Sequence, residues 1–175
     1  MLKSLKKYFL PTFVLFTFLA CDRTKRKADI VIEHTKEKLI AKKDAALDKI
    51  IPTFDSYKPD SKFNRKRFTD FFGFAPTADV RELYCYGDHL GIDGIFMFSF
   101  RCDTTTKNRI VRHLSLVQSD KPDNFGSGLW QPFPWWDSAK IVTLNPYLRR
   151  GEHEFYKYLW YDKDKSKVYY IDFDM

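Results

Sequence analysis

The sequence predicts an α+β domain in which an antiparallel sheet, built from two hairpins, carries its helices on one face. A long N-terminal helix is expected to precede this sheet. Stretches with helical spacing of apolar residues, and paired stretches rich in aromatic and β-branched residues, favour this class. Apolar residues make up 44% of the 175 residues and aromatic residues 18%, which is enough for a packed core. Three cysteines are too few for a small disulfide scaffold.

The N-terminal helix is expected over residues 28–51. This segment contains neither Gly nor Pro, and it ends at Pro52. Its apolar residues fall on one broad face: Ile32, Leu39, Ile40, Leu47, Ile50 and Ile51. This face could pack on the following domain, or the helix could be a stalk that docks a partner helix or lies on a membrane.

A second helix is predicted over residues 62–72. Asp60 or Ser61 can cap its N-terminus, because short polar side chains accept hydrogen bonds from the first N–H groups of a helix. Its apolar residues have the spacing of core residues: Phe63, Phe68, Phe71 and Phe72. Gly73 and Pro76 end the helix.

Residues 79–86 and 92–102 are predicted to form an antiparallel hairpin. Both stretches are rich in strand-forming residues, and the Gly-rich stretch 87–91 between them favours a turn. The middle of the second stretch, from Ile95 to Phe98, is apolar on both faces. Such a strand is buried on both sides, so we expect it at the centre of the sheet.

A third helix is expected over residues 105–114, with Asp103 or Thr104 as its N-cap. The stretch 118–134 is rich in Pro, Gly and Asp and is expected to be irregular. A short helical turn should begin near Trp135.

The second hairpin is predicted from residues 152–161 and 167–173. The polar stretch 162–166 between them favours a turn. Along residues 152–161, aromatic residues on one face of the predicted strand alternate with apolar residues on the other face. This pattern is typical of a strand whose two faces both contact other side chains.

Residues 1–20 have the organisation of an export signal. Three lysines among the first seven residues precede the apolar stretch 8–19, and Ala20 is small. This apolar stretch has about twelve residues, whereas a helix that crosses a bilayer needs about twenty. The pattern therefore favours a signal peptide.

The sequence Phe18-Leu19-Ala20-Cys21 resembles the lipobox of bacterial lipoproteins. In that family a small residue precedes a Cys whose thiol receives a diacylglycerol, and cleavage leaves this Cys as the mature N-terminus. The resemblance implies lipidation of Cys21 and anchoring in the inner or outer membrane of a bacterial cell envelope. The alternative is an uncleaved anchor, or cleavage elsewhere with Cys21 as an ordinary thiol.

The predicted chain therefore has three parts. Residues 1–20 form the signal peptide, and residues 21–27 form a lipid-anchored tether that is too basic and polar to join a core. Residues 28–175 form a single α+β domain that includes the helix over 28–51.

Cys85 and Cys102 are the remaining cysteines. In an oxidising compartment, a remaining pair suggests a disulfide. A turn near residue 89 would place Cys102 beyond the end of the hairpin, whereas a disulfide requires Cα atoms within about 7 Å. The sequence leaves both a disulfide and two buried free thiols open.

No motif in the sequence fixes a catalytic residue, a metal or a cofactor. The nucleophile elbow and the glycine-rich phosphate loops do not occur. Residues of the types that bind zinc occur without a closely spaced pair: Cys85, His89, Cys102 and His113. Asp88 and Asp93 lie among glycines but lack the alternating oxygen ligands of a calcium loop.

Aromatic residues are the remaining indication of a binding surface. Six of them are candidates for a partly open surface: Trp130, Trp135, Trp136, Tyr156, Tyr158 and Trp160. Tyr and Trp suit protein interfaces because they bury a large area and keep a polar tip. The alternative is that the Trp- and Pro-rich segment folds over the sheet and completes the core.

These observations predict a lipid-anchored envelope protein that binds a protein partner and is not an enzyme, for example an immunity or inhibitor protein. The alternative is an envelope hydrolase that acts on cell-wall glycans or peptides, since the pairing of carboxylates in space is not visible in a sequence. Nucleic acid is not expected as a partner, because the net charge of +7 is mild and partly lies in the first 20 residues.

Overall fold

The computed structural model describes residues 32–40, 42–43, 46, 48, 52–88, 94–123, 133–151 and 155–174. The chain divides into two compact units, Met1–Pro52 and Thr53–Met175. The signal peptide, the lipobox and the tether lie outside the described residues.

In the first unit, all the described residues from 32 to 48 are helical. The other residues of the helix predicted over 28–51 lie outside the described residues. Ile32, Leu39 and Ile40 are all more than half exposed. The α+β structure described below belongs to the second unit, Thr53–Met175, and the single domain over residues 28–175 stays a prediction.

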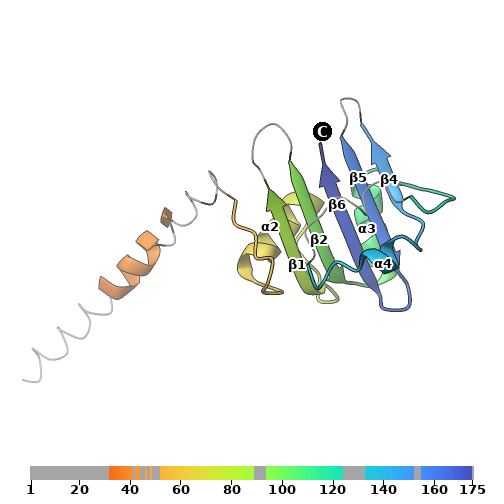
Figure 1. Cartoon of the computed structure of the whole chain (residues 1–175). Helices are drawn as coiled ribbons and strands as arrows, with labels where there is room; N and C mark the ends of the chain where they lie inside the picture. The colour runs from red at the N-terminus through yellow and green to blue at the C-terminus, as the bar shows by residue number, and fades with distance from the viewer. Residues whose placement is uncertain are drawn as a thin grey trace, which may run out of the picture. The chain divides into compact units, whose positions relative to one another are not determined.

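The second unit is an α+β structure with one antiparallel sheet (Figure 1). In chain order, its described elements are α2 (Lys62–Phe72), β1 (Arg81–Asp88), β2 (Ile95–Arg101), α3 (Thr104–His113), β3 (Val117–Gln118), α4 (Ser138–Ile141), β4 (Tyr147–Arg150), β5 (Tyr156–Asp162) and β6 (Lys167–Phe173). The strand order is β1-β2-β6-β5-β4-β3. The predicted fold class and both predicted hairpins are confirmed.

The sheet has six strands, whereas the sequence predicts four. β3 and β4 contain only two and four residues, and such short stretches carry no readable alternation. β4 pairs with the outer edge of β5, and β3 pairs with β4. β3 and β4 form because an unpaired sheet edge offers free N–H and C=O groups to a nearby segment of the same polypeptide.

The two hairpins join through β2 and β6, where Phe98 lies opposite Tyr170. Four successive residues of β2, from Met97 to Phe100, are buried. This confirms the prediction of a central strand.

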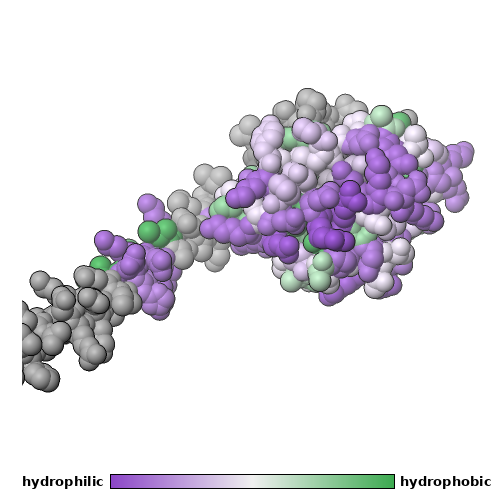
Figure 2. All heavy atoms as spheres, turned by 90° about the horizontal axis from the view of Figure 1, so that it is seen from below, coloured by the Kyte–Doolittle hydropathy of each residue, from purple (hydrophilic) through white to green (hydrophobic). Residues whose placement is uncertain are grey.

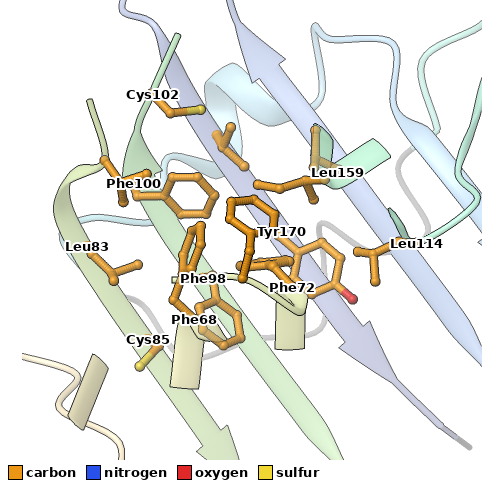
Figure 3. Packing of buried hydrophobic residues seen from close by; sticks show 14 of the residues in the cluster. Phe68, Phe72, Leu83, Cys85, Phe98, Phe100, Cys102, Leu114, Leu159 and Tyr170 are labelled. Carbon is orange, nitrogen blue, oxygen red and sulfur yellow. The ribbon is translucent and has the colours of Figure 1, made fainter. Parts of the chain in front are cut away.

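One face of the sheet packs against α2 and α3, and we call it the helix-covered face (Figures 1 and 3). Its buried sheet residues are Leu83, Cys85, Phe98, Phe100, Leu159, Val168 and Tyr170. Phe68 and Phe72 of α2 and Ile110 of α3 fill the space above them. α2 and the sheet are held together by ring-to-ring contacts, such as Phe72 against Tyr170 with centroids 5.1 Å apart.

The opposite face is the loop-covered face, which packs against the segment 133–144 that contains α4. Its buried sheet residues are Met97, Tyr158, Trp160, Tyr169, Ile171 and Phe173. Phe133, Trp135, Trp136 and Ile141 cover them. The prediction that helices pack on one face holds for α2 and α3 and is wrong for the short α4, which lies on the other face (Figure 1).

The helix ends match the sequence signals. Ser61 caps α2 by accepting the N–H of Asn64 at 3.2 Å, and Asp103 caps α3 by accepting the N–H of Thr106 at 2.7 Å. Gly73 ends α2 with φ of 73°, where a side chain would collide with the ring of His113. Among the described residues, no helix has both the length and the apolar character needed to span a membrane.

Candidate functional site

The structure buries most of the predicted aromatic surface. Trp135 and Trp136 are each 6% exposed, and Tyr158 and Trp160 are fully buried. Tyr156 is partly buried, and Trp130 lies outside the described residues. The expectation of an open surface built from these residues is therefore corrected. The Trp- and Pro-rich segment covers the sheet instead, because the rings gain most by leaving water together.

A stack of rings extends from this core to the surface. Tyr84 and Trp135 stack with centroids 5.7 Å apart, and Trp135 and Phe133 stack at 4.8 Å. The ring of Tyr57 contacts Phe133 edge-to-face at 5.8 Å and is 81% exposed. Tyr57 is thus an exposed aromatic ring supported by a rigid stack.

The segment that carries Tyr57 is fixed on both sides. Ser56 accepts the indole N–H of Trp135 at 2.7 Å through its carbonyl oxygen. The buried amide of Asn64 donates to the carbonyl oxygens of Asp55 and Lys58, at 3.0 and 3.1 Å. Tyr57 therefore lies between two anchored neighbours, although its own side chain is in solvent.

Sequence reasoning missed Tyr57. It lies in the loop between Pro52 and Pro59, next to polar residues, and it has no place in the spacing of any predicted helix or strand. An aromatic residue in a proline-bounded loop was the available signal for an exposed ring.

Cys85 and Cys102 are buried free thiols, so the possible disulfide is not formed. Cys85 lies opposite Phe98 in the ladder, and Cys102 lies four residues further along the partner chain. The two thiols occupy different ends of the cluster in Figure 3, with Phe100 between them. Spacing along a strand is about 3.3 Å per residue, which puts them out of disulfide range.

Burial raises the pKa of the Cys85 thiol to about 12, and burial likewise raises the pKa of Cys102 to about 12. The Cys85 thiol also donates to the side-chain oxygen of Asn64 at 2.9 Å. A thiol that stays protonated at neutral pH is a poor nucleophile, so both cysteines are structural in the folded protein.

The predicted metal-type residues do not come together in the part of the chain that the structure describes. No group of three or more His, Cys, Asp or Glu side chains occurs among these residues. His89 and Asp93 lie outside them. Asp88 accepts the hydroxyl of Tyr86 at 3.4 Å, and His113 packs on Gly73.

A cleft of about 340 Å³ lies at the end of β4 and β5, lined by Arg149, Gly151, Phe155 and Lys157. Arg149 and Lys157 lie directly opposite each other in the β4–β5 ladder. Their side chains therefore project from the same face, next to the exposed ring of Phe155. No motif in the sequence pointed to these residues, because only the short β4 brings Arg149 beside Lys157.

Lys157 has a counter-charge on its other side. It forms a salt bridge with Asp172 of β6, and Asp172 also accepts the hydroxyl of Tyr170 at 3.1 Å. Burial raises the pKa of Tyr170 well above its ordinary value, so this phenol remains a donor. Asp172 and Lys157 are therefore held in fixed positions at the border of the core.

Arg150, the next residue of β4, projects to the loop-covered face. Its guanidinium donates to Asp123 at 3.0 Å, and the hydroxyl of Tyr158 lies 3.4 Å from the same carboxylate. Two adjacent arginines thus have different surroundings, one paired with a carboxylate and one lining the cleft.

The surface in Figure 2 is largely hydrophilic, with small hydrophobic areas. Two local features of the described residues could bind a ligand: the exposed ring of Tyr57 and the basic, partly aromatic cleft. Paired cations beside an aromatic ring suit the binding of an anionic group. No protein-family model, no curated protein and no solved structure matches this chain.

Proposed function

We propose that the chain is a lipoprotein of the bacterial cell envelope, anchored through Cys21, and that its folded unit binds a protein partner without catalysing a reaction. The observation that carries the proposal is the pattern of residues 1–21, in which lysines, a short apolar stretch, Ala20 and Cys21 follow in this order. Two or three acyl chains on Cys21 would hold the protein on a bilayer, since each buried CH₂ contributes about 0.8 kcal/mol.

The surface features of the folded unit support a binding role. Tyr57 presents an exposed ring on an anchored segment, so little conformational entropy is lost when a partner covers it. An immunity or inhibitor protein that meets an incoming toxin at the membrane would need such a rigid contact site.

The alternative, an envelope hydrolase, has less support from the described residues. The described residues that line the cleft at the ends of β4 and β5 are two cations, a glycine and a phenylalanine. Glycoside hydrolysis uses two carboxyl groups that face the same bond.

The lipid anchor is tested by the intact mass of the protein extracted from native membranes. The expected mass is that of residues 21–175 plus a diacylglycerol, with or without a further acyl chain. Cys21→Ser should abolish this modification, whereas Cys102→Ser, the matched control, should retain it. A wild-type protein that begins at another residue, or that carries an unmodified Cys21, would overturn the proposal.

The binding role is tested by crosslinking in native membranes followed by purification under denaturing conditions. Tyr57→Ala should lose a stoichiometric protein partner that the wild type retains. Val117→Ser is the matched control, because Val117 is also highly exposed but lies on β3. Failure to recover any stoichiometric partner with the wild type, or equal recovery with both variants, would count against this role for Tyr57.

A further inference from the structure

We propose that the helical segment of the first unit lies on the surface of a bilayer that contains anionic phospholipids, and that one line of its side chains contacts the lipid. This lipid-facing line consists of Ile32, Lys36, Leu39 and Lys43. The proposal rests on the lipid anchor at Cys21, and it deepens that function by assigning a second, reversible contact with the same membrane.

The first step is the side of the helix that these residues share. The described residues from 32 to 43 are all helical and exposed (orange in Figure 1). The four residues of the lipid-facing line follow one another at steps of four, three and four, the spacing that keeps side chains on one side of an α-helix. Ile40 lies beside this line and is 60% exposed. Glu33 and Glu37 form a separate line, so aliphatic and basic side chains share one side of the segment and these two acids lie apart from it.

The second step is the presence of lysines within an aliphatic line. Lys36 lies between Ile32 and Leu39, and Lys43 follows on the same side. In a protein core, an ammonium group is costly to bury unless a counter-charge contacts it. At a bilayer surface the same side chain is favourable, because its methylene groups lie along the apolar region while its ammonium group reaches the phosphates. The lipid-facing line therefore suits a bilayer surface better than a dry protein core.

The third step is the charge of the segment that follows the anchor. Residues 22–51 contain nine lysines and arginines and six aspartates and glutamates, which gives a formal charge of +3. This count includes every residue of the segment, so it does not depend on which side chains form ion pairs. Four of the basic residues lie within residues 22–27, directly after the anchor cysteine. Anionic phospholipids attract such a segment, over a distance of about 10 Å at 0.1 M salt.

The fourth step is the reach of the chain. Ten residues separate Cys21 from Ile32, so the helix lies at most about 40 Å from the acyl chains even where this stretch is fully extended. An anchored helix meets the bilayer at a high effective concentration, because it cannot diffuse away. A weak contact made by a few aliphatic side chains and lysines is then enough to hold it on the surface.

An environment-sensitive fluorescent label on single introduced cysteines tests the proposal. Leu39→Cys places the label on the lipid-facing line, and His34→Cys, the matched control, places it on the side of the helix away from this line. The native Cys85 and Cys102 are buried thiols, so they do not take up the label in the folded protein. The protein is extracted from native membranes and reconstituted in vesicles of phosphatidylethanolamine and phosphatidylglycerol, with and without lipids that carry a quencher near the headgroup end of the acyl chain.

The quencher lipids should suppress the fluorescence of the label at position 39 and leave the label at position 34 unchanged. The reason is that a helix at a bilayer surface inserts its apolar side by about 5–10 Å. Quenching at position 39 should decrease in vesicles of phosphatidylcholine, which carry no net charge, and in 1 M salt, where the Debye length is about 3 Å. A label at position 39 that stays in water would indicate a spacer, and one that leaves water without being quenched would indicate a helix packed on protein. Either result would overturn the proposal.

A pair of lysine variants tests which side of the helix contacts the lipid. Lys36→Gln should lower the ratio of lipid-bound to free helix about fivefold, the effect of one cation near an anionic surface. Lys38→Gln is the matched control, because Lys38 lies away from the lipid-facing line, and it should change this ratio by less than about twofold. Glutamine is a good helix former, so both variants keep the helix. Equal effects of the two variants would mean attraction without a fixed side, and would overturn the assignment of this line.

Failure of the anchor and failure of this inference give different results. The intact mass reports the modification of Cys21, whereas quenching at position 39 reports the position of the helix. A protein that carries the acyl chains but shows no quenching retains the anchor and contradicts the inference. A protein with an unmodified Cys21 contradicts the anchor, and the inference is then overturned with it.

Discussion

The two faces of the sheet are both packed with aromatic rings, but the rings differ in chemistry. On the helix-covered face, the rings are mainly phenylalanines, from Phe68 and Phe72 of α2 to Phe98 and Phe100 of β2. On the loop-covered face, they are mainly tyrosines and tryptophans. A phenylalanine has no polar atom that requires a partner, whereas each buried indole N–H or phenol does.

The loop-covered face meets this requirement only in part. The indole N–H of Trp135 donates to Ser56, but the indole nitrogens of Trp136 and Trp160 have no hydrogen-bond partner among the described residues. An unsatisfied buried donor costs about 1–3 kcal/mol. We therefore expect a ring of the helix-covered face to contribute more to the free energy of unfolding than a ring of the loop-covered face.

The largest expected effect is the loss of a ring from the helix-covered face. Phe72 is fully buried and contacts rings from α2, β2 and β6. Phe72→Ala should lower the free energy of unfolding by about 4 kcal/mol, through lost burial and the cavity that remains. Phe133→Ala, on the loop-covered face, should cost less because its covering segment can relax into the space. Chemical denaturation measures both, and a larger loss for Phe133→Ala would contradict the comparison.

The next effect concerns the connection between the two faces. Asn64 of α2 donates to the carbonyl oxygens of Asp55, Lys58 and Leu83, and it accepts from the N–H of Asp55. Asn64→Ala should therefore lower the free energy of unfolding by about 3 kcal/mol, because several buried groups lose their partner at once. It should also free the segment that binds Trp135.

Asn145→Ala is the control for this variant, since Asn145 is exposed and its amide makes one hydrogen bond of 3.3 Å, to Asp120. We expect a loss below about 0.5 kcal/mol. If the two asparagine variants are equally stable, Asn64 does not connect the faces as argued.

The helix-covered face should also be sensitive to alkali. Burial raises the pKa of both Cys85 and Cys102 from the ordinary 9.0 to about 12. The unfolded chain thus releases these protons at lower pH than the folded chain. The stabilising effect of the protonated thiols is complete below pH 9 and is lost as the pH rises toward 12.

At pH 10 each thiol should lower the free energy of unfolding by roughly 1 kcal/mol relative to neutral pH. The double variant Cys85→Ser and Cys102→Ser should show a shallower decline between pH 8 and pH 10, whatever its stability at neutral pH. Part of the decline should remain, because burial also raises the pKa of Tyr169 to about 12. An unchanged slope would mean that the thiols do not titrate on unfolding.

Much of the structure of the helix-covered face could be predicted from the sequence. The helix over Lys62–Phe72 was predicted at its exact bounds, since the phenylalanine spacing, the Ser61 cap and the Gly73 stop all agree. The hairpins were also predictable, because their residues favour strands locally. The edge strands were not, since β3 and β4 depend on a neighbour rather than on their own residues.

The candidate sites were the least predictable part. The sequence pattern identified tryptophans and tyrosines as surface candidates, but the same residue types serve for a core, and only the fold decides between these roles. No sequence motif marks Tyr57 or Arg149, because the neighbours that make them candidates lie elsewhere in the sequence. Tyr57 contacts Phe133, and Arg149 lies opposite Lys157.

The smallest effect is a difference between two neighbouring tryptophans of the loop-covered face. Both are equally buried, but the indole N–H of Trp135 donates to Ser56 at 2.7 Å, while that of Trp136 has no partner in the described part of the chain. Trp135→Phe and Trp136→Phe remove the same atoms, so the cost of lost volume is similar in both. Trp135→Phe also removes a hydrogen bond and leaves a carbonyl oxygen unpaired, whereas Trp136→Phe removes an unsatisfied donor. Trp135→Phe should therefore cost about 1 kcal/mol more, measured by denaturation. Equal costs would mean that Trp136 has a partner such as an ordered water, and the loop-covered face would then be as well satisfied as the helix-covered one.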